Sequence, residues 1–403
     1  MTNAGSRRFG ATLLGLAAAV AILSGCGTSI GHQEATVGEV TVPAAGAVVV
    51  VAGTHANAPI PSLGVLGRAV VDETVRAGGP VDVVHVAATP TLDQDLKLKP
   101  VEGTEAGKNA VVEKNLHRVD EALHRASDGN GSDLLESVAM AVGRLRSVDA
   151  ESPALIVADP GLADSGRLQL TTEGMLEADP EDVAHYLNAT GSLPDLTGTT
   201  TYLVGFGYTA SPQSPLDAPL RARVSALWTA VFEAAGATVR VDSAPNTNEA
   251  LETTFSVRTV DLPAAPAQPP VCTSDEIVFG GRSDVSFVAE SDSFVDAERA
   301  RAALLPIAQW LVADSRRTAS IQGTTADDGS ARERLQALGL RRASAVVAEL
   351  RNAGASELST TAMGVGSEFP EYVRPDRDTM TGELLPGPAA LNRSVRILLD
   401  DPC

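Results

Sequence analysis

The stretch ASIQGTTADDGSARERLQALGLRRASAVVAEL, residues 319–350, joins a short strand to a long helix. The strand pattern is Ala319–Ile321, and a turn rich in Gly and Asp follows over 323–330. Beyond the turn, apolar residues recur at intervals near three and four, as on one face of a helix. These residues are Leu335, Leu338, Ala343, Val346, Val347 and Leu350. Such a unit can present its loop and the helical Arg342 to an anionic ligand, although an ordinary strand–loop–helix unit with solvated arginines gives the same pattern.

Several short motifs follow one another in a fixed order around this stretch. The main ones are GTTADDGS over Gly323–Ser330, LGLRRA over Leu338–Ala343 and NRSV over Asn392–Val395. Three more are Asp284–Phe287 as a first strand, Ala302–Leu311 as a first helix and the segment Gly364–Pro370. Together they resemble the OmpA-like peptidoglycan-binding domain. The resemblance implies an OmpA-like βαβαβ domain over residues 271–403.

In that family an aspartate and an arginine hold diaminopimelate, an amino acid of the peptidoglycan stem peptide. One anionic and one cationic side chain suit a ligand that carries both carboxylates and an ammonium group. The resemblance implies a peptidoglycan-binding site made of Thr325, Asp327, Asp328, Arg342, Asn392 and Arg393. Ala326 stands where a gapless match puts the family's aspartate, so Asp327 or Asp328 would take its place. The alternative is an OmpA-like domain that has lost the ligand and contacts other proteins.

The composition limits the classes of partner. The chain has 403 residues and a formal net charge of −20. An acidic surface repels nucleic acid phosphates and anionic lipid headgroups, so nucleic acid is not an expected partner. Hydrophobic residues make up 44% and charged residues 20% of the sequence, which is typical of a folded chain, and the length suits two domains.

The first residues resemble a bacterial lipoprotein signal. Arg7 and Arg8 are followed by the apolar run Phe9–Leu23 and by Leu-Ser-Gly-Cys ending at Cys26. The apolar run is short for a transmembrane helix. The resemblance implies a signal peptide over 1–25, lipidation of Cys26 and a tether over 26–42, which would hold the protein on the extracytoplasmic face of a cell membrane. An uncleaved anchor or a plain secretory signal is the alternative.

Export would favour one disulfide. Once Cys26 is lipidated, Cys272 and Cys403 remain, and they flank the C-terminal domain. An even pair of cysteines in an exported protein suggests a bond between them. Two free thiols are the alternative.

Residues 43–259 alternate between strand and helix patterns. The predicted strands are Ala45–Ala52, Val81–Ala87, Ala154–Ala158, Thr201–Phe206 and Thr238–Val241. The predicted helices are Pro61–Ala77, Asn109–Ala126, Asp133–Leu145, Glu181–Asn188 and Leu216–Ala235. Continuous apolar runs suit buried parallel strands, so this order predicts an α/β domain with a doubly wound parallel sheet.

The order of parts resembles a von Willebrand factor A-like domain, which binds a divalent metal at the carboxyl ends of its strands. The first loop here, Gly53–Asn57, lacks the family's aspartate and both serines. Losing those oxygen ligands leads us to expect no metal. A cleft at the switch point of the sheet would lie near Thr54, Asn57, Ser132 and Asp159, and an envelope protein is its expected partner.

No catalytic constellation is found, since H-E-x-x-H spacing, a G-x-S-x-G elbow and a P-loop are all missing. We therefore expect neither an enzyme nor a cofactor. Residues 260–270, rich in Pro and Ala, predict an extended linker between the two domains. The sequence thus predicts a lipid-anchored envelope protein that tethers the membrane to peptidoglycan, or an envelope scaffold whose OmpA-like domain no longer binds the wall.

Overall fold

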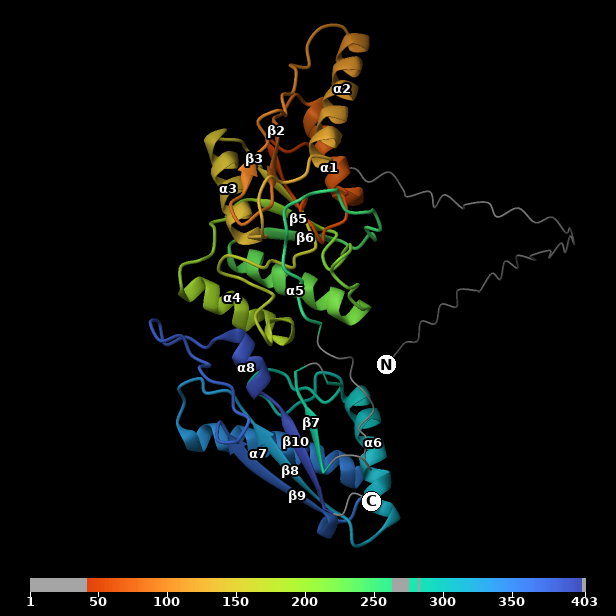
Figure 1. The fold of residues 1–403 in the computed structure, drawn as a ribbon, viewed down its shortest axis with the longest axis vertical. Coiled ribbons are helices and arrows are strands. Elements are labelled where there is room, and N and C mark those ends of the chain that lie inside the picture. Colours follow the sequence, from red (N-terminus) through yellow and green to blue (C-terminus); the bar gives the residue numbers. More distant parts are fainter. Residues whose placement is uncertain (1–41, 263–274, 282, 401–403) are drawn as a thin grey trace, which may run out of the picture. The chain divides into compact units, whose positions relative to one another are not determined.

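Figure 1 shows the fold in a computed structural model, which describes residues 42–262, 275–281 and 283–400. These residues form helices and two β-sheets, so the predicted α/β class is confirmed. The signal peptide, Cys26, nearly all of the tether and of the linker, and the pair Cys272 and Cys403 lie outside the described residues. Those features stay predictions.

The N-terminal region, residues 42–262, is built on a six-stranded sheet of order β3-β2-β1-β4-β5-β6. Its strands are β1 Val48–Ala52, β2 Val81–His85, β3 Thr91–Leu92, β4 Ala154–Ala158, β5 Thr200–Val204 and β6 Thr238–Asp242. All neighbours pair in parallel except β3, which runs antiparallel to β2 at the edge. Every residue of β1 and β4 is buried, as the continuous apolar runs in the sequence indicate.

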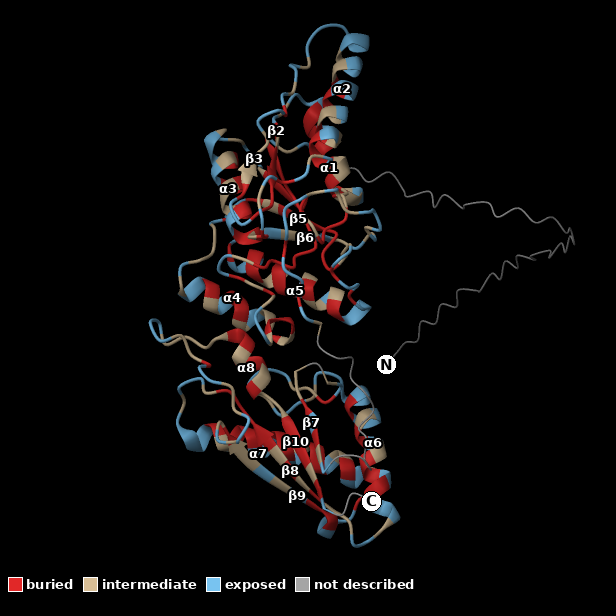
Figure 2. Cartoon of the chain, viewed as in Figure 1, coloured by how far each residue is buried: buried red, intermediate tan, exposed pale blue. Residues whose placement is uncertain are grey.

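Helices cover both faces of this sheet. They are α1 Gly64–Arg76, α2 Glu105–Leu123, α3 Leu134–Ser147, α4 Pro180–Ala189 and α5 Ala218–Ala234, with a short turn of 3₁₀ helix, η1, over Met175–Glu177. Alternate residues of a strand face opposite sides, so Val48 and Val50 pack with α1 and α2, while Val49 and Val51 pack with α3 and α5. Figure 2 shows buried strands in the middle of this sheet, whereas the edge strand β6 has no buried residue.

The predicted elements of this region are all present, with shifted ends. The helix expected from Pro61 begins at Gly64, which has a φ of 63°. Asp242 Oδ2, at the end of β6, accepts hydrogen bonds from Val65 N at 2.6 Å and Leu66 N at 3.2 Å. A carboxylate from another element therefore sets this helix start, which no local pattern could indicate. The two-residue strand β3 was also not predicted.

The C-terminal region, residues 275–400, has a four-stranded sheet of order β7-β10-β8-β9. Its strands are β7 Glu276–Phe279, β8 Thr318–Thr324, β9 Thr360–Gly366 and β10 Val395–Asp400. β8 and β9 are parallel, and β10 is antiparallel to both β7 and β8. The helices are α6 Ala297–Ala313, α7 Arg332–Asn352 and α8 Pro386–Asn392, with η2 over Glu357–Ser359.

One apolar core lies between this sheet and the helices α6 and α7. It includes Ile321 and Ile397 from the sheet, Leu304 from α6 and Val346 from α7. Figure 2 shows buried residues along β8 and β10 and exposed ones on the outer turns of α6. The expected helical period over 335–350 is thus the buried face of α7.

The prediction for the first strand of this sheet was wrong. The segment Asp284–Phe287 is not a strand, and β7 at Glu276–Phe279 takes that place. Gly280 and Gly281 end β7, and Ser283 N donates to Gly280 O at 3.0 Å in the turn that follows. Phe287 forms a single bridge with Phe294. Val285 and Phe287 belong to or pack against the apolar core of this region without forming a strand ladder.

Three glycines allow α7 to lie close against β8 and β9. A Cβ atom at Gly323 would stand 1.9 Å from Gly339 O, and one at Gly364 would stand 1.9 Å from Gln336 O. Only glycine fits such an approach. The close contact sets the height of α7 above the sheet, and with it the place of Arg342 one turn further on.

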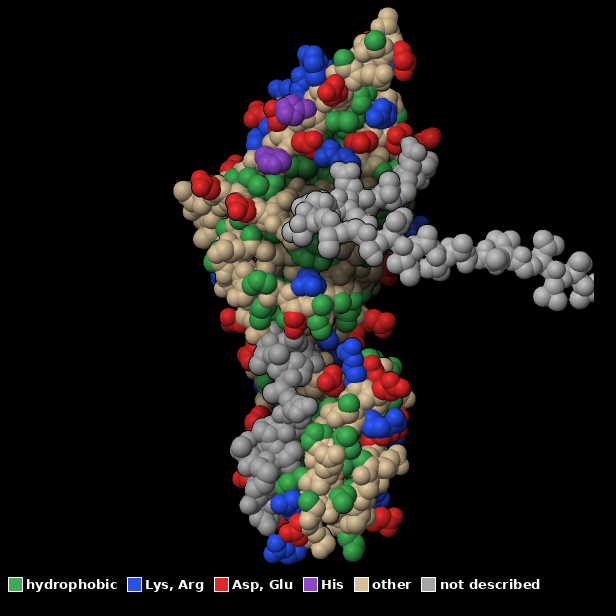
Figure 3. All heavy atoms as spheres, turned by 90° about the vertical axis from the view of Figure 1, so that its right-hand side faces the viewer, with side chains coloured by type: hydrophobic (Ala, Val, Ile, Leu, Met, Phe, Trp, Pro, Cys, Tyr) green, Lys and Arg blue, Asp and Glu red, His purple; other side chains and the backbone are tan. Residues whose placement is uncertain are grey.

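The surface carries charges of both signs. On the face drawn in Figure 3, acidic and basic side chains are intermixed over the described parts of the chain. None of the described helices is both long and apolar enough to cross a membrane.

Candidate functional site

The loop after β8 is fixed by the two threonines at the end of that strand. Thr324 Oγ1 lies 2.8 Å from Asn392 O and accepts from Ser394 N at 2.8 Å. Thr325 N donates to Gly366 O at the end of β9. These hydrogen bonds therefore fix the start of the loop relative to the sheet. Thr325 is buried and its hydroxyl has no hydrogen-bond partner among the described residues.

The two candidate aspartates of this loop have different surroundings. Asp327 Oδ1 accepts from Gly329 N, and Asp327 N donates to Tyr372 OH at 2.8 Å and to Asp376 Oδ2 at 3.0 Å. Asp328 is exposed and lines a hollow next to the loop, together with Ala326 and Arg342. Of the two carboxylates, Asp328 is thus the one that shares the hollow with the arginine.

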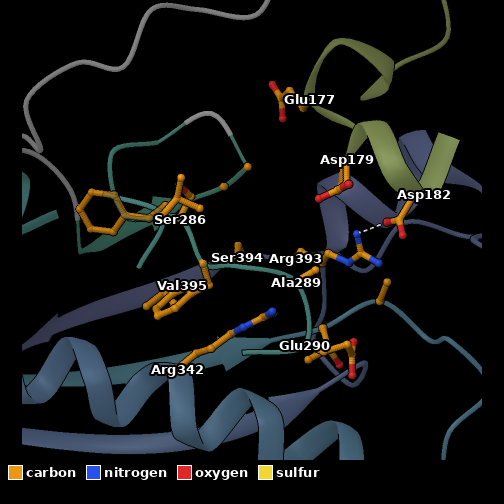
Figure 4. A pocket seen from close by; sticks show the side chains of 18 of the residues that line it. Glu177, Asp179, Asp182, Ser286, Ala289, Glu290, Arg342, Arg393, Ser394 and Val395 are labelled. Carbon is orange, nitrogen blue, oxygen red and sulfur yellow. Dashed lines mark hydrogen bonds and ion pairs between the residues drawn. The ribbon is translucent and has the colours of Figure 1, made fainter. Parts of the chain in front are cut away.

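Arg342 lies on the buried face of α7, and only 7% of it is exposed. Its Nε donates to Ser291 O at 2.9 Å, and its guanidinium carbon lies 5.5 Å from the centre of the Phe287 ring. Figure 4 shows the side chain reaching from α7 towards Ser394, with Glu290 beside it. The two terminal nitrogens of the guanidinium have no hydrogen-bond partner among the described residues.

Burial dominates the electrostatics of Arg342. Burial, with a smaller contribution from the nearby Arg393, lowers the pKa of Arg342 to about 10, while the Glu290 carboxylate raises it. The side chain stays charged at neutral pH. A buried guanidinium with spare N–H donors gains from a carboxylate, which can accept two of them at once.

Asn392 and Arg393 are neighbours in the sequence but occupy different positions at the site. Asn392 is fully buried, and its amide exchanges hydrogen bonds with Val373 N at 2.8 Å and Val373 O at 3.0 Å. It therefore holds the 372–376 loop. Arg393 follows α8 and lines the hollow. The structure thus brings Thr325, Asp328, Arg342 and Arg393 to one place, and it puts Asp327 and Asn392 behind them as supports.

Three residues at or behind the hollow were not predicted from the sequence: Glu290, Tyr372 and Asp376. Glu290 lines the hollow from a turn with a φ of 51°, and it pairs with Arg334 at 3.1 Å, where both side chains are mostly exposed. Tyr372 OH donates to Asp376 Oδ2, and burial together with that carboxylate raises the pKa of Tyr372. These residues lie in irregular segments, so no periodic signal could have found them.

In the N-terminal region, the four candidate cleft residues Thr54, Asn57, Ser132 and Asp159 are all buried near the carboxyl ends of β1 and β4. Asp159 Oδ2 lies 3.0 Å from His55 Nε2, and His55 Nδ1 lies 2.6 Å from Ala56 O. Both ring nitrogens face oxygen atoms that can accept hydrogen bonds, an arrangement that suits the charged form of the imidazole. Burial alone would lower the pKa of His55, but the hydrogen bond and charge of Asp159 outweigh it and raise the pKa.

A second chain of contacts starts at Thr54. Its hydroxyl lies 2.9 Å from His85 Nδ1, and His85 Nε2 lies 3.0 Å from Asp93 Oδ2. Arg125 Nε donates to the same carboxylate oxygen at 2.7 Å. Although burial opposes it, the hydrogen bonds from His85 and Arg125 lower the pKa of Asp93. The Thr54 hydroxyl, which was expected to face a ligand, thus contacts His85 inside the protein.

Ser132 and Asn57 complete this group. Ser132 N donates to Asp164 Oδ1 at 2.7 Å, but Ser132 Oγ and Asn57 Oδ1 have no hydrogen-bond partner among the described residues. Within the same residues, no group of three or more His, Cys, Asp or Glu side chains is arranged to hold a metal ion.

Comparison with known proteins finds likenesses to solved structures. No family model matches the chain, and no curated protein matches it. Part of the chain is similar to the peptidoglycan-associated lipoprotein from Burkholderia pseudomallei, with 28% identity and a TM-score of 0.23 over 28% of this chain and 86% of that one.

Two further structures have similar extents. The periplasmic domain of Helicobacter pylori MotB is 18% identical, with a TM-score of 0.24 over 31% of this chain and 81% of that one. The OmpA-like domain of FopA1 from Francisella tularensis subsp. tularensis SCHU S4 is 15% identical, with a TM-score of 0.22 over 30% of this chain and 69% of that one. Each likeness covers less than a third of the chain.

Proposed function

We propose that this protein is a lipid-anchored envelope protein that binds peptidoglycan non-covalently through an OmpA-like C-terminal region. The observation that carries the proposal is Arg342: a buried, charged guanidinium that lines a hollow and has spare N–H donors. A buried cation of this kind is stabilised when an anion pairs with it. From the family resemblance we identify this anion as a carboxylate of diaminopimelate.

The ammonium group of the same ligand needs an acceptor. Ala326 has no carboxylate, and Asp328 and Glu290 line the hollow that contains Arg342. Both carboxylates are exposed, so they can turn towards a ligand at little cost. Asp328 Oδ1 already accepts from Ser330 N, and the pair of Glu290 with Arg334 is solvent-exposed and weak. We assign the ammonium to these two side chains in place of the family's aspartate.

The proposal extends to the N-terminal residues and the N-terminal region. The signal-like residues 1–25 and Cys26 support a lipid anchor, and the parallel strand order with Thr54 and Asp159 at the carboxyl ends of β1 and β4 supports a von Willebrand factor A-like domain without its metal. We further propose that the protein acts by binding and not by catalysis. Release of soluble fragments from purified peptidoglycan would contradict that role.

Co-sedimentation of the full-length chain with insoluble, diaminopimelate-containing peptidoglycan tests the proposal. The wild type should bind saturably, and Arg342→Ala should lower the affinity at least about tenfold, as expected when a charge-assisted hydrogen-bonded pair is lost. Arg341→Ala is the matched control, because Arg341 is the exposed neighbour on the same helix. Equal loss in both variants, or none in Arg342→Ala, would contradict a site at Arg342.

The second candidate function is an envelope scaffold that has lost the wall ligand, and Ala326 favours it. In that case the wild-type chain would sediment no more than an unrelated acidic protein. The same experiment therefore separates the two functions.

A further inference from the structure

The end of the N-terminal region crosses the place where sheets of this type bind their ligands. Residues Phe255–Val260, here called the strap, form neither helix nor strand. The strap contacts Asn57, which follows β1, and Asp164, which follows β4. In an open parallel sheet the crevice beyond the carboxyl ends of such strands, at the point where the strand order reverses, is the usual ligand position. That reversal lies between β1 and β4.

The strap is held through its backbone, at every second residue. Ser256 N donates to Asn130 Oδ1 at 2.8 Å, Arg258 N to Asp164 Oδ2 at 2.7 Å and Val260 N to Gln213 Oε1 at 2.7 Å. Donors at every second residue are typical of an extended chain that is hydrogen-bonded along one edge. The acceptors are side chains of the same domain. The domain therefore hydrogen-bonds to the backbone of the strap as it would to a bound peptide.

The carbonyl groups of the strap are bound in the same way. Asn57 Nδ2 donates to Val257 O at 3.1 Å and to Arg258 O at 3.3 Å. Gln213 Nε2 donates to Val260 O at 3.1 Å, so one amide side chain binds both backbone groups of Val260. Because backbone groups are common to all sequences, another extended segment can make these bonds.

Side chains add selectivity. Val257 and Val260 are buried, while Ser256 and Thr259 are exposed. The Arg258 guanidinium donates to Asp164 O and to Gln169 Oε1. The preferred ligand therefore has an apolar residue, then an arginine, then any residue, then an apolar residue.

The fit of the strap leaves polar groups unused. Asn57 Oδ1 and Ser132 Oγ are buried beside it without a hydrogen-bond partner among the described residues. Asn57 has a φ of 72°. Buried polar atoms of this kind favour a ligand that supplies donors. The carboxylate of Asp164, 4% exposed, already requires the donors that an extended peptide brings.

We propose that the carboxyl ends of β1 and β4 form a binding site for an extended, arginine-containing peptide of a partner protein, and that the strap occupies this site as an internal ligand. A partner binds by displacing the strap. The tethered strap competes at an effective concentration on the order of mM, so a displacing peptide must exceed it or the strap must be weakened.

A fluorescent peptide with the sequence of residues 253–262, TTFSVRTVDL, tests this proposal by anisotropy. In the full-length Arg258→Pro chain, proline removes both the N–H donor to Asp164 and the guanidinium. This variant should bind the peptide at least about tenfold more tightly than wild type, and adding Asp164→Asn should reverse the gain. Thr259→Pro is the matched control, because Thr259 is exposed and its N–H makes no hydrogen bond among the described residues.

A folded Arg258→Pro chain that does not bind the peptide would overturn the proposal, and so would equal binding with and without Asp164→Asn. If Arg258→Pro does not fold, hydrogen exchange on the wild type decides. Millimolar peptide should then speed exchange of the Ser256, Arg258 and Val260 amides at least about tenfold. Unchanged exchange at these amides would show that the strap is a fixed part of the fold.

Discussion

Three largely buried carboxylates of the N-terminal region differ in their partners from the buried Arg342 of the C-terminal region, although Arg396 of that region has an ionic partner in Glu276. In the N-terminal region the carboxylates of Asp159, Asp93 and Asp164 each have a cationic partner, from His55, Arg125 and Arg258 respectively. In the C-terminal region Arg342 is equally well buried, yet its hydrogen bond is to a backbone carbonyl. Removing one partner of a buried ion pair destabilises the fold, whereas a buried charge without an ionic partner favours a ligand of opposite charge.

This difference predicts which substitution destabilises the protein most. His55→Leu leaves Asp159 buried without its charged partner. Breaking a buried ion pair in this way costs about 3–5 kcal/mol of unfolding free energy. Denaturant unfolding of the N-terminal region should show the loss, with His117→Leu, an exposed histidine, as the control. A cost below about 1 kcal/mol would mean that His55 is neutral in the folded state.

The opposite substitution tests the other half of the comparison. Arg342→Met keeps the length of the side chain and removes a charge that has no ionic partner, so stability should change by no more than about 1 kcal/mol. Peptidoglycan binding should nevertheless be lost. A large loss of stability, measured in the same denaturant series, would make Arg342 a structural residue.

The His55–Asp159 pair should also give the stability a pH dependence. The folded pKa of His55 is raised above its ordinary value of 6.5. The pair therefore contributes fully below about pH 6.5, and this stability is lost as the pH rises through the folded pKa. Thermal unfolding between pH 6 and 9 should show a decline that His55→Gln abolishes. A decline that persists in the variant would belong to another group.

The smallest effect is expected at the rim of the hollow. Glu290→Gln removes an exposed carboxylate, so the affinity for diaminopimelate-containing peptidoglycan should fall only about two- to fivefold. The matched control is Glu333→Gln in the first turn of α7. If Asp328→Asn alone lowers the affinity, Asp328 binds the ammonium without Glu290.

Much of the architecture could be predicted because apolar runs and helical periods are local signals. The buried strands β1 and β4 follow directly from their sequences. The start of α1 depends on Asp242, and the place of β7 depends on pairing with β10, so neither is visible locally. Contacts between residues far apart in the sequence also determine the positions of Glu290 and Asp376.

The candidate site was predicted in part. Resemblance singled out Arg342, but the pattern of α7 by itself could not separate it from Arg341, which is exposed. The supporting role of Asn392 and the burial of Thr54 and Asp159 depend on partners that lie far away in the sequence. Those roles could not have been read from residue type and spacing.

Calorimetric titration of the full-length chain with two soluble muropeptides tests the central claim most directly. One carries diaminopimelate in its stem, and the other carries lysine, which lacks the second carboxylate. If Arg342 pairs with that carboxylate, the diaminopimelate muropeptide should bind at least about tenfold more tightly, and Arg342→Met should remove the preference. Equal affinities in the wild type, or a preference that persists in Arg342→Met, would contradict the account.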